Sequence, residues 1–119
     1  MKKTVFLDCD PGLDDAIALM VLASRGDIFS LRGITAVAGN QTGEKTYLNA
    51  RRLAAYLGLT VPVAQGAVKP LRRTPLTAGD YHGEDGLAGM RAGSSFLPGD
   101  SRPAAEFLHD TLLSLEIPA

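Results

Sequence analysis

Short apolar runs alternate with helix-forming segments along this chain, and that alternation constrains the fold more than any other feature. The run Thr4–Leu7 shows no polar alternation, which is typical of a parallel strand covered on both faces. The expected elements, in order, are strand Thr4–Leu7, helix Asp14–Ser24, strand Leu31–Val37, helix Thr42–Leu57, strand Val61–Ala64 and helix Pro103–Leu115. Strands that alternate with helices predict right-handed crossovers. We therefore expect an α/β fold, a Rossmann-like open parallel sheet with flanking helices.

The first expected helix is unusually apolar. Its main apolar face consists of residues at the spacing of one helix face, namely Ala16, Leu19, Met20 and Ala23. Three more apolar residues widen that face: Ile17, Val21 and Leu22. A helix with such a wide apolar surface is predicted to be well buried.

Composition and charge narrow the functional classes. The chain has 119 residues, of which 45% are hydrophobic and 21% charged, as in one soluble globular domain. The net charge of -1 gives no electrostatic basis for binding nucleic acid or an anionic membrane. The single cysteine, Cys9, excludes an internal disulfide. The apolar run after Lys3 stops at Leu7, too short for a signal peptide, so we expect a cytoplasmic protein.

Polar residues stand where each expected strand ends. Asp8 and Asp10 follow the first strand, and Asn40 follows the second. His82 lies in the long glycine- and proline-rich segment 66–101 after the third strand. Ligands of open parallel sheets bind beyond the carboxyl ends of the strands. A segment of this length without periodicity is usually functional or disordered. We therefore expect these residues to gather at one edge of the sheet.

The stretch DCDPGLDDA, residues 8–16, crowds four aspartates together. Asp8 and Asp10 are two residues apart, so in a continued strand they lie on the same side, about 7 Å from each other. Cys9 then points the other way and is expected to be a small buried residue. Crowded carboxylates repel unless they are protonated or neutralised. A hard divalent cation, Ca²⁺ or Mg²⁺, is the natural counter-ion. Asp14 and Asp15 fit the first turn of a helix, where a capping role is the simpler alternative.

Two other classes of protein also have closely spaced aspartates in their motifs. An EF-hand loop counted from Asp8 needs glycine and glutamate where this chain has Leu13 and Leu19, so that class is excluded. A phosphohydrolase of the haloacid dehalogenase type would use Asp8 as nucleophile and Asp10 as acid-base with Mg²⁺. Its motif requires threonine or valine where Gly12 stands, and it leaves the following aspartate pair unused. That class stays an alternative.

Three segments together resemble one known family. They are DCDPGLDDA at 8–16, GNQTGEKTYLNA at 39–50 and HGEDGL at 82–87. In this order and spacing they resemble the nucleoside hydrolases, the inosine-uridine-preferring family of N-ribohydrolases. The resemblance implies hydrolysis of the N-glycosidic bond of ribonucleosides to ribose and free base. It leaves the choice between purine and pyrimidine bases open.

The resemblance implies a Ca²⁺ centre built on the aspartates. Asp10 and Asp15 would be carboxylate ligands of the cation, and Asp10 would also act as general base for a Ca²⁺-bound water. Asp8 would support the cluster. Ca²⁺ lowers the pKa of bound water, and a carboxylate can then accept the proton as water attacks the anomeric carbon. Carboxylates near the sugar stabilise its oxocarbenium character.

The resemblance also implies substrate contacts. Asp14 would bind the ribose hydroxyls, and Asn40 would contact the sugar side of the pocket. His82 would act near the leaving base as a catalytic residue. Each has a simpler alternative, since Asn40 after Gly39 fits a turn and a lone loop histidine is usually solvated. His109 is expected on the surface.

The resemblance covers only part of the family pattern. Residues 1–119 are expected to form the N-terminal fragment of a nucleoside hydrolase domain, whose full-length parent would be a homodimer or homotetramer. The remaining Ca²⁺ ligands of the family are not matched here. Because Ca²⁺ takes about six to eight oxygen ligands, two carboxylates with waters would bind it weakly. The chain by itself is thus expected to be inactive, and a non-catalytic remnant is a further alternative.

Overall fold

The computed structural model of the chain describes residues 1–76, 87 and 95–115, and it has the predicted α/β architecture. The elements are β1 (Lys3–Cys9), α1 (Leu13–Ser24), β2 (Phe29–Ala36), α2 (Gly43–Tyr56), β3 (Val63–Gln65) and α4 (Ala104–Ser114). The three strands form one parallel sheet in the order β1-β2-β3. The α/β fold and its open parallel sheet are therefore confirmed.

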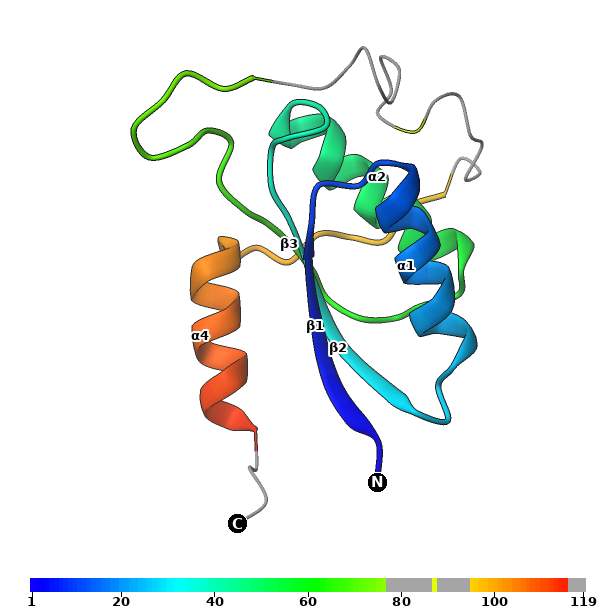
Figure 1. Cartoon of the computed structure of the whole chain (residues 1–119). Coiled ribbons are helices and arrows are strands. Elements are labelled where there is room, and N and C mark those ends of the chain that lie inside the picture. Colours follow the sequence, from blue (N-terminus) through cyan, green and yellow to red (C-terminus); the bar gives the residue numbers. More distant parts are fainter. Residues whose placement is uncertain (77–86, 88–94, 116–119) are drawn as a thin grey trace.

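The helices cover the two faces of the sheet unequally. Figure 1 shows α1 and α2 together on one face and α4 alone on the other. The carboxyl ends of β1 and β2 point to the same edge, where the chain turns into α1 and α2. That edge is where the sequence predicted the polar residues to gather.

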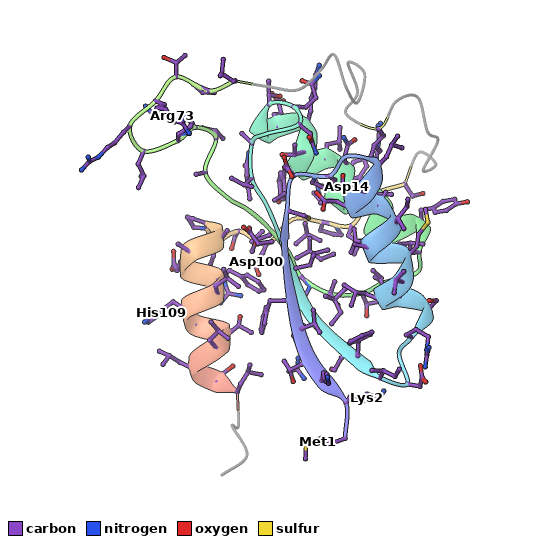
Figure 2. All side chains as sticks on the ribbon, viewed as in Figure 1. Met1, Lys2, Asp14, Arg73, Asp100 and His109 are labelled. Carbon is purple, nitrogen blue, oxygen red and sulfur yellow. The ribbon has the colours of Figure 1, made fainter. Side chains whose placement is uncertain are left out.

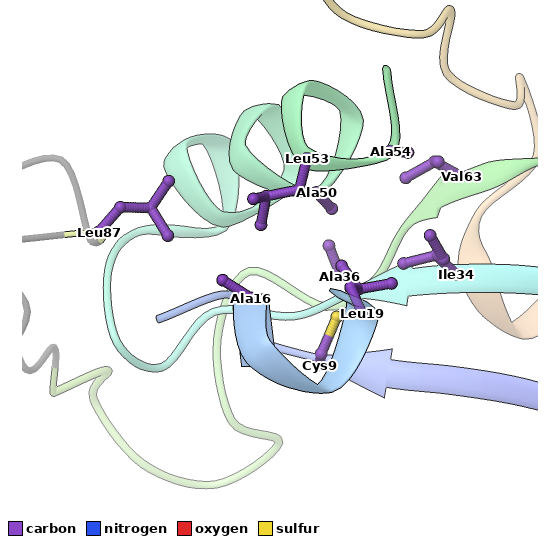
Figure 3. Packing of buried hydrophobic residues seen from close by; sticks show 10 residues of the cluster. All are labelled: Cys9, Ala16, Leu19, Ile34, Ala36, Ala50, Leu53, Ala54, Val63 and Leu87. Atoms are coloured by element: carbon purple, nitrogen blue, oxygen red, sulfur yellow. The ribbon is translucent and has the colours of Figure 1, made fainter. Parts of the chain in front are cut away.

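The main core lies between the sheet and the pair α1 and α2. Figure 3 shows its ten buried members: Cys9, Ala16, Leu19, Ile34, Ala36, Ala50, Leu53, Ala54, Val63 and Leu87. Many of them are alanines, so the helix backbones approach the strands closely. Cys9 is among them, as the sequence predicted.

A smaller core lies under α4. Phe107 is almost fully buried there beside Ala64, and its ring meets that of Phe6 edge to face at 6.5 Å between centroids. A Cβ placed on Gly33 would lie 2.6 Å from the Phe107 ring. Glycine in the middle of β2 therefore makes room for Phe107, the largest buried side chain that α4 places against the sheet.

Local signals set most element boundaries. The Thr42 hydroxyl accepts a hydrogen bond from the backbone N–H of Lys45 at 3.4 Å and caps α2. Gly58 ends that helix region with a φ of 70°, which glycine adopts without strain. β1 continues two residues beyond its predicted end, because Asp8 and Cys9 pair in register with Thr35 and Ala36.

The predicted deep burial of α1 is wrong. Only Ala16 and Leu19 are fully buried on this helix, whereas Ile17 is 61% and Val21 50% exposed. The sheet and α2 cover one face of α1, and nothing in the described part of the chain covers the opposite one. No helix among the described residues is long and apolar enough to cross a membrane.

Residues 96–100, in the segment between β3 and α4, contact both α2 and β3. The Arg51 guanidinium stacks on the rings of Tyr47 and Phe96, and its Nε donates to the carbonyl oxygen of Leu97 at 2.6 Å. The N–H of Asp100 donates to the carbonyl oxygen of Val63 at 2.7 Å. These contacts hold residues 96–100 against α2 and β3, and α4 follows directly.

We predict that Phe107→Ala lowers the free energy of unfolding by about 3 kcal/mol, because it empties the core under α4. The matched control is Leu113→Ala on the same helix, since Leu113 is 73% exposed. That control should change the free energy by less than about 0.5 kcal/mol. Urea denaturation of both variants measures the difference, and equal effects would contradict this packing of α4.

Candidate functional site

The carboxyl edge of β1 and β2 brings most of the predicted site residues together. Asp8 belongs to β1, Asp10 follows it directly, and Asp15 lies in the first turn of α1. Asn40 lies between β2 and α2. Asp14 stands at the exposed start of α1, at the same edge of the sheet (Figure 2). The turn Pro11–Gly12 is buried and carries the chain from strand to helix within this cluster.

Asp10 and Asn40 are joined by two hydrogen bonds. The backbone N–H of Asn40 donates to Oδ2 of Asp10 at 2.9 Å, and the Asn40 side-chain Nδ2 donates to the Asp10 carbonyl oxygen at 2.6 Å. The N–H of Val37 also donates to the carbonyl oxygen of Cys9 at 2.9 Å. The end of β1 is thereby tied to the segment that follows β2, which fixes the direction of the Asp10 carboxylate.

Gly39 has no side chain, and this leaves room for the Asp10 carboxylate beside Asn40. The Asp10 carboxylate packs so closely on Gly39 that an added Cβ would collide with Oδ2 of Asp10. Any larger residue at 39 would therefore have to displace the carboxylate. The sequence motif Gly39-Asn40 is explained by this close approach together with the N–H that the next residue donates.

Asp15 is drawn into the same cluster. The backbone N–H of Asp10 donates to Oδ2 of Asp15 at 3.2 Å. Burial, followed by the negative charge of Asp14, raises the pKa of Asp15 to about 6, although the N–H of Asp10 opposes the rise. A carboxyl group with this pKa carries its charge only in part at slightly acidic pH.

Asp8 has different partners from Asp10. Thr35 lies opposite Asp8 in the register of β1 and β2, and its hydroxyl donates to Oδ1 of Asp8 at 2.6 Å. Asp8 also lines an open pocket of about 520 Å³, together with Gln65 and the start of α4 at Ala104. Asp8 is therefore held between the sheet edge and this pocket, while Asp10 faces the segment after β2.

Cys9 separates these two aspartates. Its thiol packs in the core and donates to the carbonyl oxygen of Thr35 at 3.6 Å. Burial, and then the charge of Asp15, raises the pKa of this thiol well above its usual range. Cys9 therefore stays protonated and has the packing role that the sequence predicted.

Neither histidine, His82 or His109, is described as part of this cluster. His82 lies outside the described residues, so its predicted role stays a prediction. His109 is exposed on α4, where its Nδ1 lies 3.3 Å from Oδ1 of Asp110, and Figure 2 shows it on the far side of the sheet from Asp14. The surface position predicted for His109 is confirmed.

The donor chemistry of the cluster fits part of a hard-cation site. Among residues 1–76, 87 and 95–115, none of the ion pairs found involves the aspartates at positions 8–15. In the same residues no group of three or more histidine, cysteine, aspartate or glutamate side chains is arranged to hold a metal ion. Asp10 and Asp15 offer carboxylate oxygens of the kind that Ca²⁺ prefers, but two residues supply only part of its shell.

Sequence reasoning missed two residues of this site. Thr35 looked like an ordinary β-branched strand residue, and only the strand register shows that it faces Asp8. Gly39 was read as a turn residue, and only the folded structure shows Asp10 against it. A polar residue near the end of one strand, paired with a carboxylate at the end of the next, is the signal that would have found Thr35.

Comparison with known proteins gives the same family from sequence and from structure. The profile described as inosine-uridine preferring nucleoside hydrolase matches residues 5–118. The pyrimidine-specific ribonucleoside hydrolase RihB of Escherichia coli O17:K52:H18 is 42% identical over 113 residues, covering 95% of this chain. The pyrimidine-specific ribonucleoside hydrolase RihA of Shewanella woodyi is 52% identical over 90 residues, covering 75% of this chain.

Solved structures of nucleoside hydrolases superpose on nearly all of this chain. The plant nucleoside hydrolase PpNRh1 superposes on 95% of this chain with a TM-score of 0.85 at 27% identity. The purine-preferring ribonucleoside hydrolase of Gardnerella vaginalis superposes on 94% of it with a TM-score of 0.82 at 26% identity.

The matched region covers most of this chain but only about a third of the length of each relative. The chain spans 36% of the RihB relative and 28% of the RihA relative, and it spans 37% of the Gardnerella vaginalis chain and 36% of the plant PpNRh1 chain. The match begins in β1 and runs past α4, so it includes the aspartate cluster and both cores. The chain belongs to the inosine-uridine preferring nucleoside hydrolase family.

Proposed function

We propose that this chain carries the aspartate half of a ribonucleoside hydrolase site, which cleaves the N-glycosidic bond to give ribose and free base. The observation that carries the proposal is the cluster itself. At the ligand-binding edge of a parallel sheet, Asn40 fixes the Asp10 carboxylate, and the backbone N–H of Asp10 donates to the Asp15 carboxylate. Family membership supports the same reaction class.

In this proposal the cluster residues have separate tasks. Asp10 accepts the proton of the attacking water, because its carboxylate is held in one direction by the N–H of Asn40. Asp14 is exposed beside it and binds the ribose hydroxyls. Asn40 already donates its Nδ2 to the Asp10 carbonyl, so its contact with the sugar is made by the side-chain oxygen. His82 serves the leaving base.

The proposed cofactor is Ca²⁺, held by Asp10 and Asp15. Members of the family carry a metal ion in the active site, and the crowded carboxylates here supply hard oxygen ligands. When bound, the cation supplies Lewis acidity that makes a water more acidic. Asp8 supports the cluster from the neighbouring side through Thr35. Ligands beyond Asp10 and Asp15 come from outside the described residues.

The proposed substrate is a pyrimidine ribonucleoside, and uridine is the first compound to test. The relatives RihA and RihB are named pyrimidine-specific, although the superposed Gardnerella vaginalis protein is named purine-preferring. We also propose that the reaction takes place in the cytoplasm and that the active protein is a homo-oligomer. The phosphohydrolase alternative with Asp8 as nucleophile has no support from the relatives, which are all nucleoside hydrolases by name.

Replacing Asp10 tests the reaction directly. In a hybrid enzyme where this chain replaces the matched 113 residues of the RihB relative, we expect ribose release from uridine. Asp10→Ala should lower kcat by roughly 10²–10⁴-fold, because the proton acceptor is lost. The control Asp27→Asn removes an exposed aspartate that pairs only with Arg25 in the described structure, and it should leave kcat unchanged. Full activity of Asp10→Ala would refute the proposed role.

Replacing Gly39 tests the packing that fixes Asp10. Gly39→Ala should weaken Ca²⁺ binding by the hybrid enzyme about tenfold, because the added methyl group displaces the Asp10 carboxylate. The matched control is Gly26→Ala, since nothing lies within 4 Å of a Cβ at Gly26. Isothermal titration calorimetry with CaCl₂ measures both variants. Equal affinities for Gly39→Ala and Gly26→Ala would contradict the close contact of Gly39 with Asp10.

The raised pKa of Asp15 predicts a pH-dependent stability. A carboxyl with a folded pKa of about 6 and an ordinary unfolded pKa near 3.9 binds more protons when folded. Without Ca²⁺ its contribution therefore destabilises the fold as pH rises through 6. Asp15→Asn should raise the free energy of unfolding at pH 8 by roughly 1 kcal/mol, after allowing for partial solvent screening, and by much less at pH 4. Urea denaturation at both pH values checks this, and a pH-independent effect would argue against the crowded charge.

A further inference from the structure

Thr46 is a fully buried polar residue in the first turn of α2. It lies on the face of α2 that also buries Ala50 and Leu53, and Ala50 belongs to the same core as Ala36 at the end of β2 (Figure 3). Valine has nearly the shape of threonine and would pack there without a polar group. A buried hydroxyl is unfavourable unless it is hydrogen-bonded, so the role of this threonine follows from its hydrogen bond.

The hydroxyl of Thr46 bonds to a backbone carbonyl outside its own helix. Its Oγ1 donates to the carbonyl oxygen of Val37 at 2.9 Å and lies 3.2 Å from the carbonyl oxygen of Gly43. A hydroxyl has one hydrogen, and the shorter contact assigns it mainly to Val37. The contact with Gly43 is the usual one of a helical threonine with its preceding turn. The bond to Val37 instead ties the start of α2 to the residue that follows β2.

Val37 begins the segment that brings Asn40 to the Asp10 carboxylate. Asn40 follows three residues later, and both its N–H and its Nδ2 donate to Asp10. The N–H groups of Val37 and Ala38 donate to carbonyl oxygens at the end of β1 and just after β3. Backbone bonds of this kind do not depend on side-chain identity. The bond from Thr46 does, because it requires one side-chain hydroxyl.

We propose that Thr46 is a positioning residue for the hydrolytic site. Its hydroxyl fixes Val37, and through residues 37–40 it fixes the direction from which Asn40 holds the Asp10 carboxylate. Because a misplacement of about 1 Å in a catalytic group can lower a rate roughly 10²-fold, a small shift of this segment matters. Thr46 is fully buried and therefore touches no substrate itself. This inference rests on the proposed role of Asp10 in hydrolysis.

Hydrogen exchange of the Asn40 amide tests the positioning in the 119-residue chain, without reference to activity. Thr46→Val removes the hydroxyl and keeps the shape of the side chain. The reference amide is that of Ile34, which donates to the carbonyl oxygen of Pro62. We expect the exchange rate at Asn40, relative to that at Ile34, to rise at least tenfold, because the bond from Asn40 to Asp10 is loosened. Thr46→Ser keeps the hydroxyl and should keep the ratio within about threefold of the unmodified chain.

The matched control is Ser24→Ala on α1. The Ser24 hydroxyl donates to the carbonyl oxygen of Val21 at 3.0 Å, a contact within its own helix, so its loss should leave the exchange ratio unchanged. If Thr46→Val does not fold, Thr46→Ser and Thr46→Ala make the same comparison, since they differ by the hydroxyl alone. An unchanged ratio in Thr46→Val, or equal ratios in Thr46→Ser and Thr46→Ala, would overturn the proposal.

Kinetics of the hybrid enzyme connect this position to the reaction. With kcat expressed per folded enzyme, Thr46→Val should lower kcat for uridine about tenfold, and Thr46→Ser should recover most of it. A purely structural role would reduce the amount of folded enzyme and leave this kcat unchanged, so an unchanged kcat would also overturn the proposal. If the unmodified hybrid releases no ribose, the proposed function fails, whereas the exchange ratio at Asn40 still decides whether Thr46 holds the segment.

Discussion

The parallel pairing of β1 with β2 is the constraint on which the site depends. Its last two pairs set Asp8 against Thr35 and Cys9 against Ala36, so the two strands end together. The two hydrogen bonds between Asp10 and Asn40 then continue this alignment beyond the sheet. A slip of one residue would turn Cys9 outward and Asp8 into the core. The buried thiol and the solvated carboxylates therefore enforce the same register.

The cost of this arrangement is crowded negative charge. Burial and neighbouring aspartates raise the pKa of Asp15 and of the Cys9 thiol, and the described ion pairs place no cation beside them. A fold keeps such a cluster when a ligand neutralises it, because unpaired charge close to a core is otherwise unfavourable. The same logic explains why hydrogen-bond donors at this edge, Thr35 and Asn40, all point at aspartate oxygens.

Sequence periodicity predicted the element order because apolar spacing is a local property. It gave the end of β1 too early, since strand pairing carries polar residues such as Asp8 into the ladder. It gave α1 too much burial, because a local pattern records how apolar a helix is but not how many neighbours cover it. The aspartates were found from their crowding, whereas Thr35 and Gly39 act only through partners about 30 residues away along the chain. Long-range pairing of this kind has no signature in a single sequence.

The proposal that Asp10 and Asp15 hold Ca²⁺ is tested most directly by a Ca²⁺ titration of the isolated chain, followed through the side-chain carboxyl ¹³C resonances of its aspartates. We expect the Asp10 and Asp15 resonances to shift together with one apparent Kd, because in our proposal both carboxylates bind the same ion. Asp27, which pairs with Arg25 far from the cluster, should not move, and Asp8, held by Thr35, should move little. Shifts confined to Asp8 and Asp14, with Asp10 and Asp15 unchanged, would contradict the division of roles among the four aspartates.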